Sequence, residues 1–247
     1  MVSKGYKRTT TLLAALFLLA GCVTRLPWSD EKPGETNAAF HTEKNVMVMD
    51  SVTIEHRPGK FIFSTSLPQT AVSVPFATAL GTAGPRGYSV QFGHKATTYT
   101  APATVDLHGT ADAVLGVDSW IGPVVAIDYQ KGIISFDKTI PLRDDMVVSE
   151  YDGPPSVAVS VAGQTVQAIV DTASPDTLTL PLSYGSAGRG RVSVALGGAT
   201  FGSVDVRFAG VSDARVGNRL LSKFLVLIDQ KRHQVALWRD PRTPAGV

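Results

Sequence analysis

The segment Ala168–Pro181, AIVDTASPDTLTLP, decides the fold class of this chain of 247 residues. Apolar residues lead into Asp171 and Thr172, and a second alternating apolar strand begins at Leu178. A carboxylate in a tight turn between two buried strands can activate a water molecule, and the hydroxyl of Thr172 can brace the turn by hydrogen bonding. A small residue such as Ala173 lets a substrate backbone come close. The segment therefore predicts a candidate catalytic turn.

The segment Phe61–Val74, FIFSTSLPQTAVSV, repeats this layout earlier in the chain. Ser64 stands where Asp171 stands in the other copy, and Thr65 matches Thr172. Two carboxylates held close together share a proton, because both cannot ionise at once, and one of them can then act as a general acid. A serine hydroxyl cannot share an acidic proton, so the sequence predicts a broken dyad within one chain.

A second pair of matching segments follows at a constant offset of 101 residues, where residues 111–136 correspond to residues 212–237. Each copy contains a glycine, Gly116 or Gly217, and then an Ile-Asp pair. Two motifs in the same order in each half indicate an internal duplication. Short alternating apolar runs, separated by glycine, proline or Asn/Asp turns, predict β-strands throughout both halves.

The motifs around Asp171 and Gly217 resemble those of the aspartic proteases, and their repetition resembles a tandem, retropepsin-like protein. The resemblance implies an all-β fold of two retropepsin- or pepsin-like β-barrel lobes. Lobe one is expected at residues 46–145 and lobe two at residues 155–240. In the family, the glycine strand crosses beside the catalytic loop, and the Asp of the Ile-Asp pair begins the turn of the closing hairpin.

The same resemblance implies the site residues. Asp171 is the candidate catalytic residue, followed by Thr172 and Ala173 in lobe two. Ser64 and Thr65 form the degenerate half of the site in lobe one. A relic carboxylate that only hydrogen-bonds its own turn is the alternative role for Asp171.

The sequence departs from the family pattern at other positions besides Ser64. Ala173 replaces the usual glycine, and Arg215 stands where the family has an apolar core residue. Family members lower a β-hairpin flap over the substrate. Here the segments 77–87 and 183–190 are glycine-rich and short for such a flap, so mobile loops are expected.

The N-terminal segment predicts export. Basic residues precede the apolar run Leu12–Ala20, which is too short to span a membrane as a mature helix and is typical of a secretory signal. The run ends at Cys22 in a segment that resembles a bacterial lipobox, in which the cysteine is lipidated and becomes the new N-terminus. An ordinary signal peptide with a chance cysteine is the alternative. We expect a signal peptide at residues 1–21 and a flexible tether at residues 22–45.

The location follows from the lipid. Val23 after Cys22, in place of an aspartate, suggests sorting to the outer membrane of a Gram-negative cell, by resemblance to known lipoproteins. The protein is then expected in the cell envelope, on the periplasmic face of that membrane, and bound to it through the lipid on Cys22.

Charge and composition exclude several partners. Three of the 23 basic residues and none of the 21 acidic ones lie in the signal segment, so the mature chain carries a net charge of −1. Nothing in this balance favours nucleic acid. Cys22 is the single cysteine, so no disulfide forms within one molecule, and the five histidines lack metal-ligand spacing. We expect no metal and no cofactor.

Two functional hypotheses remain beside a purely structural role. The first, which the missing acid favours, is a degenerate protease that binds a peptide or an envelope protein between its lobes. The second is an active aspartic endopeptidase, with two copies of Asp171 brought together by dimerisation or with Asp112 or Asp213 as the second acid. The oligomeric state is left open.

Overall fold

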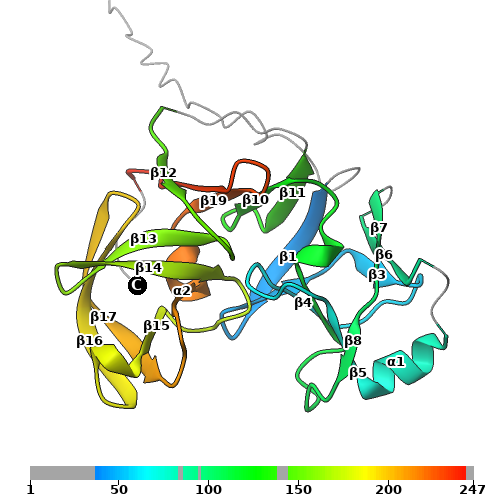
Figure 1. The fold of residues 1–247 in the computed structure, drawn as a ribbon. Coiled ribbons are helices and arrows are strands. Elements are labelled where there is room, and N and C mark those ends of the chain that lie inside the picture. Colours follow the sequence, from blue (N-terminus) through cyan, green and yellow to red (C-terminus); the bar gives the residue numbers. More distant parts are fainter. Residues whose placement is uncertain (1–36, 83–85, 94–95, 138–143, 243–247) are drawn as a thin grey trace, which may run out of the picture. The chain divides into compact units, whose positions relative to one another are not determined.

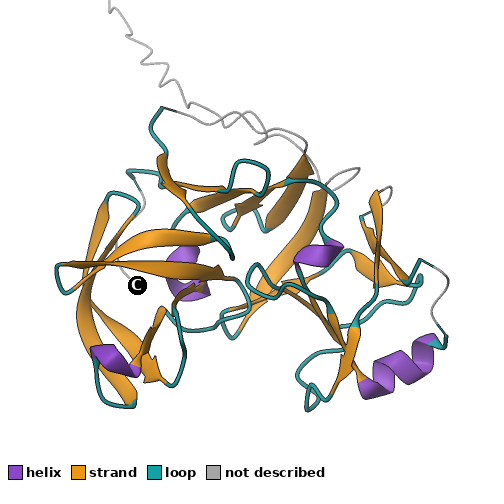
Figure 2. Ribbon diagram, in the orientation of Figure 1, coloured by secondary structure: helices purple, strands orange, loops and turns teal. Residues whose placement is uncertain are grey.

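The computed structural model describes residues 37–82, 86–93, 96–137 and 144–242. Figure 2 shows that strands dominate these residues and that the helices are few and short. The predicted all-β class of two lobes is confirmed. The predicted signal peptide, the lipidation site Cys22 and the first part of the predicted tether lie outside the described residues.

A central run of strands joins the two halves of the chain (Figure 1). Its order is β12 (Val147–Glu150), β20 (Gln234–Trp238), β19 (Leu225–Asp229), β10 (Val124–Asp128), β11 (Ile133–Asp137) and β1 (Asn37–Glu43). Strands β10 and β19 pair antiparallel, with Ala126 opposite Leu227. These two residues are equivalent in the repeat, so a pseudo-two-fold axis passes between them. The register confirms the internal duplication.

Lobe two is a closed barrel. Its strands are, in order, β13 (Ser156–Val161), β14 (Gln164–Asp171), β18 (Ala214–Gly217), β15 (Leu178–Pro181), β17 (Ala199–Ala209) and β16 (Gly188–Leu196). Alternate residues of these strands point inward and form an aliphatic core, which includes Val170, Leu178, Leu180 and Val216. The core holds the two strands that flank the candidate turn in place.

Lobe one repeats the pairing of lobe two but does not close. The strands β2 (Val46–Met49), β4 (Phe61–Phe63), β9 (Ala113–Leu115), β5 (Ala71–Ser73) and β8 (Ala103–Val105) continue the central sheet. The strands β3 (Val52–Ile54), β6 (Tyr88–Phe92) and β7 (Ala96–Thr100) form a separate sheet. Pro102 lies between β7 and β8, and a proline cannot donate to a strand ladder. Its position fits the interruption of the barrel wall there.

The structure corrects three predicted segments. The tether expected to extend to residue 45 ends earlier, because β1 pairs with β11 and β2. The mobile loop expected from residue 77 is partly a helix, α1 (Val74–Leu80), whose first turn is capped by Ser73 and contains Pro75. The loop expected at residues 183–190 holds a 3₁₀ turn, η2 (Leu182–Tyr184), and the first residues of β16.

Candidate functional site

The glycine strands cross beside the two repeated turns, as the resemblance implies. In lobe two, β14 ends at Asp171 and runs parallel to β18, which places Gly217 beside Asp171. A Cβ atom on Gly217 would lie 2.3 Å from the carbonyl oxygen of Asp176, and one on Gly116 would lie 2.7 Å from the carbonyl oxygen of Leu67. Only glycine permits these close approaches.

Two buried threonines, Thr65 and Thr172, join the turns to each other. The backbone N–H of Thr65 donates to Oγ1 of Thr172 at 3.1 Å, and the N–H of Thr172 donates to Oγ1 of Thr65 at 3.3 Å. Each hydroxyl then donates across the boundary between the lobes, Thr65 to the carbonyl of Val170 at 2.5 Å and Thr172 to the carbonyl of Phe63 at 2.7 Å. These reciprocal bonds hold Ser64 and Asp171 on adjoining turns.

Both oxygens of the Asp171 carboxylate have protein partners. Oδ1 accepts the backbone N–H of Ala173 at 3.1 Å, within the turn. Oδ2 accepts Nη1 of Arg215 at 3.0 Å, in an ion pair. Asp171 is 6% exposed, whereas the Arg215 side chain is 36% exposed. Arg215 therefore occupies a position where the family pattern has an apolar core residue, but its guanidinium binds the carboxylate of Asp171.

The hydroxyl of Ser64 makes the contacts of only one of the two carboxylate oxygens of Asp171, namely Oδ1. Its Oγ accepts the backbone N–H of Leu67 at 3.1 Å and that of Ser66 at 3.3 Å, as Oδ1 of Asp171 accepts the N–H of Ala173. It also lies 3.3 Å from Oγ of Ser66. The hydroxyl holds its turn and has no second oxygen to direct at a water molecule.

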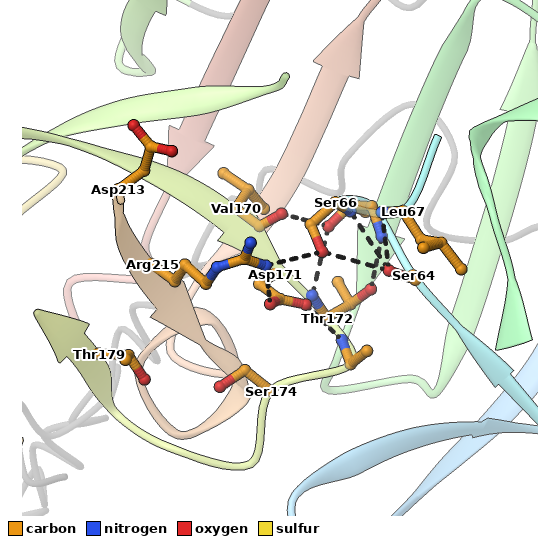
Figure 3. A network of polar contacts seen from close by, with 12 residues as sticks. Ser64, Ser66, Leu67, Val170, Asp171, Thr172, Ser174, Thr179, Asp213 and Arg215 are labelled. Atoms are coloured by element: carbon orange, nitrogen blue, oxygen red, sulfur yellow. Dashed lines mark hydrogen bonds and ion pairs between the residues drawn. The ribbon is translucent and has the colours of Figure 1, made fainter. Parts of the chain in front are cut away.

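Ser66 links the two halves of the site. Its Oγ lies 3.3 Å from Ser64 and 3.5 Å from Nη1 of Arg215, the second contact being a weak one. A polar chain therefore runs from Asp171 through Arg215 and Ser66 to Ser64 (Figure 3). The position that a second acid needs is taken by hydroxyl groups.

The other candidate carboxylates do not join this site. Asp112 accepts the backbone N–H of Lys60 at 2.8 Å and braces the start of β4. Asp213 is exposed and accepts the hydroxyl of Ser212 at 2.5 Å, and Figure 3 shows its carboxylate pointing away from Asp171. The expectation of a second acid at Asp112 or Asp213 is therefore wrong for the folded single chain.

Asn218 and Tyr129 form a hydrogen-bonded pair that supports the lobe-two turn. Nδ2 of Asn218 donates to the carbonyl of Thr172 at 2.5 Å, and the hydroxyl of Tyr129 donates to Oδ1 of Asn218 at 2.6 Å. Desolvation of this hydroxyl, and to a smaller extent the charge of Asp171, raises the pKa of Tyr129 well above its ordinary value. The phenol thus stays neutral and serves as a donor.

The arrangement places a cation beside the carboxylate of Asp171. A shared proton needs a second acid within reach of Asp171, and a hydroxyl and a guanidinium stand there instead. A guanidinium has five N–H donors, and among the described residues only Nη1 of Arg215 has hydrogen-bond partners. The remaining donors can bind a carboxylate or a peptide carbonyl.

Comparisons with known proteins bear on the fold. No protein-family model matches the chain, and no curated protein matches it in sequence. Among solved structures, the chain is similar to an aspartic proteinase from Irpex lacteus, with a TM-score of 0.54 and 10% sequence identity. The match covers 83% of this chain and 97% of that one. The chain has an aspartic-proteinase-like fold.

Among the described residues, no helix is long and apolar enough to cross a membrane. No group of three or more His, Cys, Asp or Glu side chains is placed to hold a metal ion among these residues.

Sequence reasoning missed the role of Arg215 and did not find Ser66, Asn218 or Tyr129. One signal was available for Arg215, because the equivalent residue of the other repeat is Val114. A charge at one copy of an otherwise apolar position indicates a partner nearby. Nothing comparable distinguishes Ser66, whose role depends on how the two turns meet.

Proposed function

We propose that this protein is a lipid-anchored pseudoprotease that binds a peptide or an envelope protein between its lobes and does not cleave it. The observation that carries the proposal is the ion pair between Asp171 and Arg215, next to Ser64 at the position of the second acid. Each change alone interrupts the proton-sharing pair, and the two occur together.

Arg215 also supplies a binding group in place of the lost chemistry. Its unused N–H donors form a planar fork that matches a carboxylate, and Asp171 holds one edge of the guanidinium in place. A peptide with an acidic side chain or a free C-terminal carboxylate fits this fork. The preferred ligand of the proposal is therefore an extended peptide with a carboxylate near Arg215.

The threonine contacts argue against the alternative of an active dimer. Thr65 and Thr172 satisfy each other's backbone groups within one chain. A pairing of Asp171 with Asp171 from a second chain would have to break these buried bonds and leave both copies of lobe one without a partner. We rank this arrangement below the single-chain pseudoprotease.

The proposed location keeps the expectation from the N-terminal segment. A lipid on Cys22 would tether the folded lobes to the periplasmic face of the outer membrane, and the ligand would be an envelope peptide or protein. Metabolic labelling with a radioactive fatty acid tests the anchor. Label should enter the wild-type chain and be absent from Cys22→Ser.

The experiment for catalysis compares the purified wild type with Asp171→Ala on a diverse peptide library from acid to neutral pH. Neither protein should cleave. The double variant Ser64→Asp/Arg215→Val should cleave at acid pH, because it restores the second acid and removes the cation. Cleavage by the wild type that Asp171→Ala abolishes would show an active peptidase and overturn the proposal.

Matched variants make this result specific. Ser64→Asp alone should stay inactive, since Arg215 still binds Asp171. Ser64→Asp/Arg191→Val serves as the control, because Arg191 is an exposed arginine paired with Asp205 at 3.6 Å. For binding, peptides with a free C-terminal carboxylate should lose affinity for Arg215→Val and keep it for Arg191→Val.

A further inference from the structure

A pocket of about 440 Å³ adjoins the lobe-one turn, and Ser66 of the polar chain forms part of its wall. Its walls include Thr65, Val117, Tyr151, Gln230 and His233. This volume lies in the range of about 300–1,000 Å³ that is typical of small-molecule sites. The pocket is lined by both halves of the chain, so the internal repeat can explain its origin.

The residues around the pocket have equivalents on the other side of the pseudo-two-fold axis. The N–H of Tyr151 donates to the carbonyl of His233 at 3.0 Å, just as that of Phe40 donates to the carbonyl of Gly132 at 2.8 Å. The repeat offset makes His233 equivalent to Gly132. Tyr151 and Phe40 are thus corresponding residues.

The hairpin turns on the two sides also match. Oδ1 of Asp229 accepts the N–H of Lys231 at 3.0 Å, and Oδ1 of Asp128 accepts that of Gln130 at 3.0 Å. Gln230, between Asp229 and Lys231, is therefore equivalent to Tyr129.

A third correspondence lies beside the glycine strands. The N–H of Val117 donates to the carbonyl of Leu67 at 2.8 Å, and the N–H of Asn218 donates to the carbonyl of Ser174 at 3.0 Å. Val117 and Asn218 follow Gly116 and Gly217 directly in the sequence. Val117 is therefore the counterpart of Asn218.

On the other side of the axis, the corresponding space is filled by a phenol ring. Tyr129 packs edge-on against Phe40, with ring centroids 5.6 Å apart, and its hydroxyl donates to Asn218 at 2.6 Å. On the pocket side, Gln230 has no ring, and the side chain of Val117 has no oxygen that could accept a hydrogen bond from a hydroxyl. The pocket occurs where the repeat lacks the ring of Tyr129.

The walls keep the features that suit a ring. Tyr151 supplies an aromatic face and stacks on His233, with centroids 5.4 Å apart and an interplanar angle of 29°. Pro154 and Val117 add apolar surface, and the side chains of Gln230 and His233 provide polar atoms for a hydroxyl. An aromatic ring gains from burial and from edge or offset contacts with aromatic neighbours.

We propose that this pocket binds a phenol ring, either of a small molecule or of a tyrosine side chain in a peptide. The ligand ring takes the position that Tyr129 occupies on the other side of the pseudo-two-fold axis. Because Val117 stands at the position of Asn218 and its side chain cannot accept a hydrogen bond, the hydroxyl of the ligand donates to Gln230 or His233. The proposal does not depend on whether Asp171 is catalytic.

The first experiment titrates the purified chain with p-cresol, toluene and a tyrosine-containing peptide by calorimetry. p-Cresol should bind about tenfold more tightly than toluene, because only p-cresol carries the hydroxyl, and tenfold corresponds to about 1.4 kcal/mol. Binding by p-cresol but not by the peptide identifies a small-molecule site. Displacement of p-cresol by the peptide identifies a peptide site. Absence of p-cresol binding up to its solubility limit overturns the proposal.

The second experiment fills the pocket with a tyrosine side chain of the protein itself. Gln230→Tyr/Val117→Asn rebuilds the pair seen in Tyr129 and Asn218, so it should abolish p-cresol binding and raise the melting temperature. Gln164→Tyr, at an exposed residue of β14, adds a tyrosine elsewhere and should leave binding unchanged. Unchanged p-cresol affinity in the filled variant would place the ligand elsewhere and overturn the proposal.

A measurement on the wild type covers the case in which the filled variant does not fold. The ring current of bound p-cresol should shift the methyl resonances of Val117 and leave those of Val226, buried in β19, unchanged. Shifts at Val226 without shifts at Val117 would contradict the assignment of the pocket.

Discussion

Arg215 binds Oδ2 of Asp171. Arg215 lies on β18, the strand that also places Gly217 beside Asp171. The relationship joins a side chain that is 9% exposed to one that is 36% exposed, so the two partners depend on the pair unequally. A guanidinium that loses its partner can turn to water. A carboxylate at this depth cannot do so without moving the turn.

This asymmetry predicts the stability of two variants. Arg215→Val should lower the free energy of unfolding by about 1–3 kcal/mol, because it leaves a buried acceptor unsatisfied. Asp171→Ala should cost less, since Arg215 can become solvated. Urea unfolding followed by circular dichroism measures both. A larger loss in Asp171→Ala would mean that the carboxylate holds the turn through Ala173 more than through Arg215.

The threonine contacts predict coupled losses. Thr65→Val and Thr172→Val should each cost about 1–3 kcal/mol of unfolding free energy, because each leaves a buried N–H and a carbonyl without a partner. Their double-mutant cycle should give a coupling energy of about 0.5–3 kcal/mol. Thr53→Val is the matched control, since the buried Oγ1 of Thr53 has no hydrogen-bond partner in the described structure. Its stability should be unchanged or increased.

Tyr129 predicts a dependence of stability on alkaline pH. Desolvation raises the pKa of Tyr129 in the folded chain, whereas the unfolded phenol ionises near pH 10. The folded state therefore holds a proton that the unfolded state releases, so the stabilisation is complete below about pH 10 and decreases as the pH rises further. Tyr129→Phe should show a shallower loss above that pH. Tyr184→Phe, at an exposed tyrosine, should follow the wild type.

Strand β1 predicts where the folded body begins. A chain that starts at residue 37 keeps the pairing of β1 with both β11 and β2, whereas one that starts at residue 44 loses it. The second truncation also removes Phe40, whose burial alone contributes about 1.5–3 kcal/mol. The first chain should unfold cooperatively on heating. The second should unfold at a lower temperature or show no cooperative transition. Equal melting temperatures would show that β1 is dispensable.

The main features of the fold could be predicted from the sequence because the repeat gives each motif twice. Asp171 with Thr172 and Ser64 with Thr65 stand in short segments whose local pattern is enough to place them between strands. The glycine strands follow for the same reason. Once both copies were aligned, the meeting of the turns required no further information.

The remaining features depend on contacts between distant residues. Helix α1 was missed because Phe76 is the one buried residue within it, so no apolar period marks it. Arg215 was noted as a departure, but its partner lies 44 residues earlier and is reached only because β14 and β18 are neighbours. The pocket arises from a ring that Gln230 lacks, and a missing side chain leaves no local pattern.

The pseudo-two-fold axis between Ala126 and Leu227 has a consequence for how such a site can change. In an assembly of two identical chains, every substitution appears on both sides of the axis at once. A covalent fusion of the halves removes that constraint. One half can keep an acid while the other gives it up, and one can keep a ring while the other opens a space. Fusion thus lets a symmetric scaffold carry two different sites.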